Sequence, residues 1–273
     1  IISEGAGSEM KTIKLTKPER QKLITDKLKE YPALRVSELS QDIGVSTETI
    51  RRDLDELESL GLISRTYGGA APAITKEPSF KQREMVNVKQ YEIIARATCH
   101  YINDGEVLAI GSSVTTLQVA VRLAAEKRDL TVFTDSYAIA SALSSNPTFK
   151  VHVCPGLYND DENCVFGPES INYFSNIYVN KAILGATGLN QIGVSNVDLE
   201  IGETYKAMAR SASETIIVAD SSKISKNAVS LFLPWNQISR LIIDKPPFDE
   251  ELTVGLKHGK VDVTIATESS WSF

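Results

Sequence analysis

The stretch from Val45 to Gly69, VSTETIRRDLDELESLGLISRTYGG, constrains the fold of this chain more than any other part of it. Ser46 stands where a side chain caps the first N–H groups of a helix. Ile50, Leu54 and Leu57 then recur at a spacing that places them on one helical face. A glycine ends this helix, and a short apolar run leads to a Gly-Gly pair. The order predicts a helix followed by a β-hairpin.

The polar face of the predicted helix carries two adjacent arginines, Arg51 and Arg52. Such a pair by itself usually marks only a solvated surface. Upstream, Thr16-Lys17-Pro18-Glu19 has the form of a capping box with proline just inside a helix. Residues 38–43 then predict a second short helix, and Gly44-Val45 a tight turn. Three helices and a hairpin in about fifty residues are the order of a winged helix-turn-helix.

In a winged helix-turn-helix, the third helix enters the DNA major groove and the hairpin, or wing, lies on the neighbouring backbone or minor groove. The residues predicted to contact double-stranded operator DNA precede the second helix, open the third or lie on the wing: Arg35, Ser46, Thr47, Thr49, Arg51, Arg52, Arg65, Tyr67 and Gly68. An alternative is that Tyr67 only packs the wing. A winged helix used solely for protein contacts is less favoured, because the arginines lie on its exposed face.

The run IRRDLDELESLGLISRTYGGA, from Ile50 to Ala70, resembles the N-terminal signature of DeoR-type bacterial transcription regulators. The formal net charge of the chain is −6, yet residues 11–70 hold eleven Lys and Arg against ten Asp and Glu. Affinity for DNA phosphates must therefore come from the local placement of cations. We expect tight DNA binding only from a dimer or higher homo-oligomer.

The chain of 273 residues is long enough for two domains. We predict a tail over residues 1–15, a winged helix over 16–71, a linker over 72–90 and a sensor domain over 91–273. No apolar run approaches a membrane span and no signal peptide is recognisable, so we expect a cytoplasmic protein. We predict no metal site, because the cysteines and histidines lack the spacing of metal ligands. These residues are Cys99, Cys154, Cys164, His100, His152 and His258.

Beyond residue 105, short apolar stretches alternate with helical patterns. The predicted strands are 107–110, 130–133, 149–154, 181–184, 215–218, 241–243 and 261–265. This alternation predicts an α/β domain with a mostly parallel sheet covered on both faces. Ligands of such sheets bind beyond the carboxyl ends of the strands.

Polar residues follow several of these strands. The loop from Gly111 to Thr116 opens a helix, and its small residues and hydroxyls suit a phosphate at the helix N-terminus. The alternative is an ordinary helix cap. Asp135 follows the second strand, and Glu203 and Lys206 lie one helical turn apart, where a simple surface ion pair is the alternative.

Residues 106–232, including KAILGATGLN and ADSSK, resemble the sensor domain of DeoR-type regulators, whose fold is similar to ribose-5-phosphate isomerase. The resemblance implies that a sugar phosphate binds at Ser113, Thr115, Thr116, Asp135, Glu203, Lys206 and Lys223. With the strand-end residues included, the predicted effector site comprises Gly111, Ser112, Ser113, Thr115, Thr116, Asp135, Ser136, Gly156, Glu203, Lys206 and Lys223.

The whole pattern predicts a DNA-binding transcription regulator without cofactor or catalytic residues. We expect a repressor of genes for the catabolism of sugars or sugar derivatives, relieved by a phosphorylated sugar. The competing interpretation is a sugar-phosphate isomerase with an appended DNA-binding domain, which needs a general base such as Asp135 or Glu203.

Overall fold

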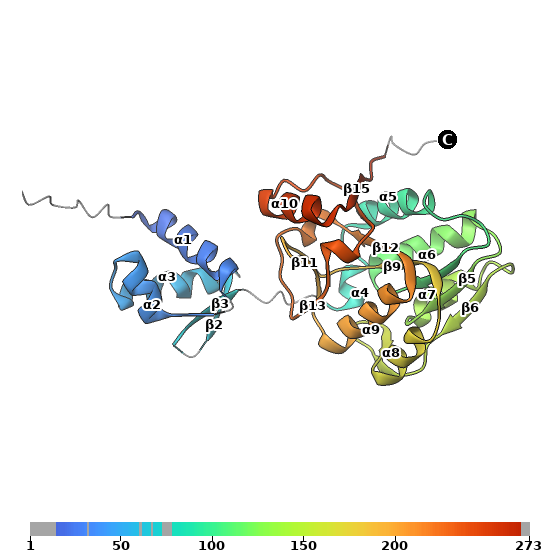
Figure 1. Ribbon diagram of the computed structural model, residues 1–273, viewed down its shortest axis with the longest axis horizontal. Helices are drawn as coiled ribbons and strands as arrows, with labels where there is room; N and C mark the ends of the chain where they lie inside the picture. The colour runs from blue at the N-terminus through green and yellow to red at the C-terminus, as the bar shows by residue number, and fades with distance from the viewer. Residues whose placement is uncertain (1–14, 32, 60–61, 67, 73–77, 269–273) are drawn as a thin grey trace, which may run out of the picture. The chain divides into compact units, whose positions relative to one another are not determined.

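The computed structural model describes residues 15–31, 33–59, 62–66, 68–72 and 78–268, which belong to two compact units that divide between residues 74 and 75 (Figure 1). No helix within these ranges is both long enough and apolar enough to cross a membrane.

The first unit is a winged helix-turn-helix. Its elements in chain order are α1 (Lys17–Glu30), β1 (Leu34–Arg35), α2 (Val36–Ile43), α3 (Thr47–Ser59), β2 (Ile63–Thr66) and β3 (Gly69–Pro72). The strands form an antiparallel sheet in the order β1-β3-β2. α1 begins with the predicted capping box, and the Oγ atom of Ser46 accepts the Thr49 N–H at 3.2 Å, as the sequence predicts for α3.

The core of this unit is formed by the apolar faces of the three helices. Ile50, Leu54 and Leu57 of α3 are buried against Ile24 and Leu28 of α1. The third strand, β1, was not predicted. Its pairing with β3 is so close that a Cβ atom on Gly69 would lie 2.1 Å from the carbonyl oxygen of Leu34, so this strand contact requires glycine.

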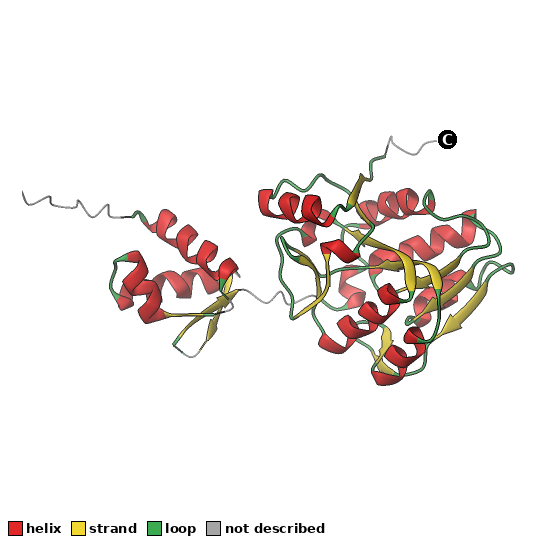
Figure 2. Cartoon of the chain, in the orientation of Figure 1, coloured by secondary structure: helices red, strands yellow, loops and turns green. Residues whose placement is uncertain are grey.

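The second unit is built on a seven-stranded parallel sheet (Figure 2). Its strands are β4 (Val107–Ile110), β5 (Thr131–Thr134), β6 (Lys150–Val153), β9 (Val179–Leu184), β12 (Ala212–Ala219), β14 (Arg240–Ile243) and β15 (Asp262–Ile265). Every neighbouring pair is parallel. All seven strands predicted from the apolar stretches are thereby confirmed, with boundaries shifted by a few residues at most.

Helices cover both faces of this sheet. One face packs against α5 (Val88–Cys99), α6 (Val114–Glu126) and α7 (Tyr137–Leu143), with buried residues such as Ile94, Val119 and Ile139. The other face packs against α8 (Pro168–Ser175), α9 (Leu199–Arg210) and α10 (Glu250–Gly259), with Phe174 and Tyr205 in its core. Alternation along each strand produces the two cores, since neighbouring strand residues face opposite sides.

Several smaller elements complete the second unit. They are the helix α4 (Phe80–Arg83), the hairpin β7 (Leu157–Asn159) and β8 (Cys164–Phe166), the antiparallel strands β10 (Gly188–Leu189), β11 (Gly193–Asn196) and β13 (Ser230–Pro234), and the 3-10 helices η1 (Ser221–Lys223) and η2 (Trp235–Gln237). The interval 72–90, expected to be a linker, thus contains α4 and the start of α5. Phe80 of α4 is buried with Tyr91 and Val114, so this segment packs on the second unit.

The strand order β15-β14-β12-β9-β4-β5-β6 contains one reversal of direction. From β4 the chain proceeds outward through β5 to β6. It then returns to the other side of β4 and proceeds outward through β9, β12, β14 and β15. The carboxyl ends of β4 and β9 therefore border the crevice at which open parallel sheets bind ligands.

Candidate functional site

The loop between β4 and α6 is organised by its own hydroxyl groups. The Oγ atom of Ser113 accepts the Thr116 N–H at 3.0 Å and caps α6. The Thr116 hydroxyl donates to the Gly111 carbonyl at 2.6 Å. The N–H groups of Val114 and Thr115, in the first turn of α6, have no acceptor within the helix. This end of α6 can therefore donate hydrogen bonds to an anion.

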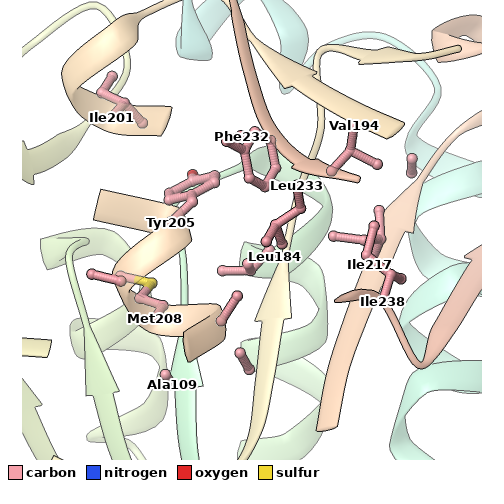
Figure 3. Close-up of a cluster of buried hydrophobic side chains, with 14 of the residues drawn as sticks. Ala109, Leu184, Val194, Ile201, Tyr205, Met208, Ile217, Phe232, Leu233 and Ile238 are labelled. Carbon is pink, nitrogen blue, oxygen red and sulfur yellow. The ribbon is translucent and has the colours of Figure 1, made fainter. Parts of the chain in front are cut away.

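Tyr205 of α9 supports this loop from the core. Its hydroxyl donates to the Ser112 carbonyl, and its ring lies edge-on to Phe232 with centroids 5.5 Å apart (Figure 3). Complete burial raises the pKa of the Tyr205 phenol well above its usual value. A Cβ atom at Gly111 would lie 2.9 Å from the Tyr205 ring, so glycine lets the loop approach the ring closely.

A cavity lies at the carboxyl ends of β4, β9 and β12, and the space of about 420 Å³ within it includes open solvent. A Cβ atom at Gly185, after β9, would lie 2.6 Å from Ser113, so the loops after β4 and β9 are in close contact at the mouth of the cavity. The lining residues are Arg83, Tyr91, Ser112, Ser113, Val114, Thr115, Glu162, Gly185, Ala186, Thr187, Asn196, Tyr205, Asp220 and Lys223.

Two carboxylates in the cavity wall, Glu162 and Asp220, are bonded to residues of the segment 78–87. The Arg83 guanidinium binds the Glu162 carboxylate with both of its terminal nitrogens, at 3.1 and 2.7 Å. The Asn87 amide donates to Oδ1 of Asp220 at 3.2 Å. Oδ2 of Asp220 is buried and has no hydrogen-bond partner among the described residues. An acceptor left in this way suits a ligand that brings its own donor, such as a hydroxyl group.

The structure brings four of the predicted effector residues together in the cavity wall. Ser112, Ser113 and Thr115 come from the loop after β4, and Lys223 comes from η1, after β12. This arrangement agrees with the expectation that polar groups meet at one sheet edge.

Asp135, which was also predicted to bind the effector, is not among the residues that line the cavity. The side chain is completely buried beneath the loop, and its Oδ1 atom accepts the Ser112 N–H at 2.7 Å. Desolvation by burial raises the pKa of this carboxyl group to about 8, although the Ser112 N–H opposes the shift. Asp135 therefore supports the loop from behind. Gly111 and Thr116 also serve the internal structure of the loop.

The remaining predicted effector residues do not line the cavity. Ser136 caps α7, and Gly156, with a positive φ of 150°, packs tightly against Phe166 and Ser170. Glu203 and Lys206 form an ion pair of 2.9 Å on α9, with side chains 51% and 30% exposed. This is the surface ion pair that the sequence left open as an alternative.

Ten of the fourteen residues that line the cavity were not among the predicted effector residues. Thr187 and Asp220 lie in the loops that follow two predicted strands, and this position is the signal that could have selected them. Arg83, Glu162 and Asn196 come from α4, from the loop between β7 and β8, and from β11. No local pattern indicates that these three segments meet.

The candidate DNA interface lies on α3 of the first unit. The side chains of Arg51 and Arg52 are 57% and 79% exposed, and Thr47 is exposed beside them. Glu48 lies 4.0 Å from Arg51 and 3.3 Å from Arg52. These exposed pairs contribute little to stability, so both arginines are available for DNA phosphates or bases.

The other predicted DNA contacts are distributed around α2 and the wing. Arg35 is exposed at the start of α2, and Gly68, with a positive φ of 82°, forms the turn of the wing. Arg65 is half-buried and lies 3.6 Å from Asp55. Ser46 bonds to Thr49, so both contribute to the cap of α3. The prediction for Tyr67 falls outside the described residues.

The described part of the chain holds no group of three or more His, Cys, Asp or Glu side chains that could bind a metal ion. All three cysteines are free and buried. Burial raises the pKa of the Cys99 and Cys154 thiols to about 12, which makes them unreactive near neutral pH.

Comparison with known families gives two matches. The profile of the DeoR C terminal sensor domain matches residues 86–245, and that of the DeoR-like helix-turn-helix domain matches residues 20–75. An uncharacterized HTH-type transcriptional regulator, YulB of Bacillus subtilis, is 32% identical over 249 residues, which are 90% of this chain and 95% of that protein.

Two further relatives carry names that describe a function. The HTH-type transcriptional repressor GlcR of Bacillus subtilis is 29% identical and covers 84% of this chain and 89% of its own. A putative aga operon transcriptional repressor of Escherichia coli O157:H7 is 27% identical, and the match covers 92% of this chain and 94% of that protein. Among solved structures, a D-ribose-5-phosphate isomerase in complex with phospho-erythronic acid aligns over 50% of this chain and 54% of its own, with 15% identity and a TM-score of 0.38.

Proposed function

We propose, because this chain belongs to the DeoR family of transcription regulators, that it represses genes of sugar or sugar-derivative catabolism and releases its operator when a phosphorylated sugar binds. The names of the GlcR and aga operon relatives support repression. An isomerase with an appended DNA-binding domain is not supported, because relatives that match over nearly the whole chain are named transcription regulators or repressors. Binding to operator DNA fits a cytoplasmic protein.

The observation that carries the effector proposal is the chemistry of the cavity at the ends of β4, β9 and β12. The α6 N-terminus, the Ser113 and Thr115 hydroxyls and Lys223 suit a phosphate group. Asp220 and Asn196 line the same cavity and suit the hydroxyl groups of a sugar. Donors and cations for an anion thus lie beside acceptors for a polyol.

The DNA part of the proposal places α3 in the major groove and the wing on the adjacent backbone. Arg51 and Arg52 are its main contacts, supported by Thr47, Arg35 and the Gly68 turn. The effector releases DNA only if it binds the DNA-incompetent arrangement of the protein more tightly than the competent one.

The effector proposal is tested by a thermal-shift panel of pentose and hexose phosphates, each beside its dephosphorylated form. A ligand that binds only the native protein raises the melting temperature. Lys223→Ala should weaken binding of the best phosphorylated ligand by about tenfold or more, because it removes a cation from the cavity.

Lys206→Ala is the matched control, since it also removes one lysine charge from this unit but lies outside the cavity wall. It should leave ligand binding unchanged. Equal binding of phosphorylated and free sugars by the wild-type protein would mean that the α6 N-terminus is only a capped helix end.

A further inference from the structure

Residues 78–87, here called the strap, directly follow the segment 73–77 that joins the two units in the chain. The strap contains α4 and is bound to loops on both sides of the effector cavity. The Phe80 N–H donates to the Asp161 carbonyl at 2.8 Å, and Asn87 donates to Asp220 at 3.2 Å. Phe80 is 1% exposed, so the strap is firmly packed on the second unit.

Arg83 is the strap residue that lines the cavity, and its guanidinium joins two distant parts of the chain. It binds Glu162 in the cavity wall, and its Nη1 atom donates to the Pro78 carbonyl at 2.9 Å. Pro78 is the first described residue after the junction between the units. One side chain therefore connects the effector cavity to the backbone that leads to the DNA-binding unit.

The charges of the cavity wall are balanced before a ligand enters. Arg83 and Lys223 are the cations among its described residues, and Glu162 and Asp220 are the carboxylates. The Arg83 and Glu162 side chains are only 12% and 19% exposed, so little solvent screens them. An entering phosphate adds up to two negative charges, repels Glu162 and attracts the same guanidinium.

We propose that Arg83 couples effector binding to DNA release, by exchanging Glu162 for the anionic group of the effector. This inference rests on the proposed effector site. The exchange moves the guanidinium away from the Pro78 carbonyl and frees the start of the strap, the described part of the second unit that is nearest in sequence to the DNA-binding unit. Glu162 competes with the anion for Arg83, and while the cavity is empty it holds the guanidinium where it also bonds to the Pro78 carbonyl.

The test uses the full-length protein and inorganic phosphate as the probe, at constant ionic strength. Glu162→Gln keeps the shape of the side chain and removes the competing charge. It should bind phosphate several-fold more tightly than the wild type. Asp160→Asn is the matched control, because it makes the same charge change in the same loop on a side chain that is 79% exposed. It should shift phosphate affinity less than twofold.

Arg83→Lys tests the connection to the strap. Lysine retains a cation for the phosphate, but its single ammonium group cannot replace the planar guanidinium that bonds to the Glu162 carboxylate and the Pro78 carbonyl together. Phosphate affinity should fall only a few-fold. Amide hydrogen exchange at residues 80–84 should be fast even without phosphate, whereas phosphate should accelerate it in the wild type. The phosphate-dependent loss of affinity for a DNA site selected with the wild-type protein should shrink toward onefold in this variant.

The outcomes separate the two proposals. If the wild type binds no phosphate and no sugar phosphate, the effector site itself is wrong. If phosphate binds the wild type but Glu162→Gln binds it equally or more weakly, the effector site stands and the competitive role of Glu162 is wrong. Unchanged coupling in Arg83→Lys would also overturn the inference.

Discussion

Asp135 shows how a single buried carboxyl group makes stability depend on pH. Its pKa is raised to about 8 in the folded protein, so the folded state keeps a proton that the unfolded chain releases near pH 4. Stability should therefore fall as the pH rises, until the folded group ionises near pH 8. Between pH 6 and pH 8 the loss should be about 2 kcal/mol.

Asp135→Asn provides the control, since its amide oxygen can still accept the Ser112 N–H but the group no longer titrates. Urea unfolding of both proteins at pH 6 and pH 8 measures the difference. A pH dependence that persists unchanged in the variant would show that other groups cause it.

The Arg20–Asp53 ion pair is the second residue-scale feature with a clear consequence. It joins α1 to α3 with a two-pronged contact, and the two side chains are 12% and 3% exposed. Asp53→Ala leaves a nearly buried guanidinium without its partner and should destabilise the first unit by roughly 3 kcal/mol. Urea unfolding of the full-length protein, followed by circular dichroism, measures the loss.

Lys17→Ala is the matched control for Asp53→Ala. It breaks an ion pair to Glu56 between the same two helices, but these side chains are 55% and 41% exposed. The expected loss is under about 1 kcal/mol. Equal losses in the two variants would contradict a special role for burial at this helix contact.

At the scale of elements, α3 carries the prediction for DNA. Arg51→Ala should weaken operator binding by about 1–3 kcal/mol if Arg51 reads a base. Arg52→Ala should reduce affinity for all sequences and also reduce its dependence on salt, if Arg52 binds a phosphate. Fluorescence anisotropy with specific and random DNA, at several salt concentrations, separates these roles. Wild-type affinity in both variants would exclude this docking of α3.

The cavity of the second unit is formed by several loops that the parallel sheet brings together. None of the loops after β4, β9 and β12 forms a cavity alone. They meet because the strand order reverses between β4 and β9, which leaves a crevice that no crossover connection fills. The strap and the β7–β8 loop then complete the wall with Arg83 and Glu162.

At the scale of the whole molecule, the charge distribution predicts assembly. The residues of the winged helix are nearly neutral overall, while the chain carries −6. One such unit attracts DNA weakly, so tight binding should require a homo-oligomer that contacts repeated half-sites. We expect light scattering at micromolar concentration to show a dimer or larger, and binding to fall steeply when one half-site is removed. A monomer with full affinity for a single half-site would contradict this.

The sequence by itself determined the three helices and the hairpin of the first unit and the seven parallel strands of the second, but not β1, α4 or the smaller antiparallel strands. Helical and strand periodicity reflects which faces are buried. The capping box marks the start of a helix, and glycines mark turns and helix ends. The winged helix and the seven parallel strands followed from these local signals, and so did the expectation that polar groups meet at the carboxyl ends of the strands. Ser113 and Thr115 lie in the segment after β4 and Lys223 in the segment after β12, and the resemblance to the DeoR sensor domain implied all three.

Only the tertiary structure decided which polar groups face the cavity. Asp135 and Ser113 both lie in loops that follow neighbouring strands, yet Asp135 is buried beneath the β4–α6 loop and Ser113 lines the cavity. Arg83 and Glu162 are 79 residues apart in sequence and meet only in the folded chain. The direction of a side chain at a strand end depends on the packing of other segments around it. That information is distributed over the whole chain, and no local pattern contains it.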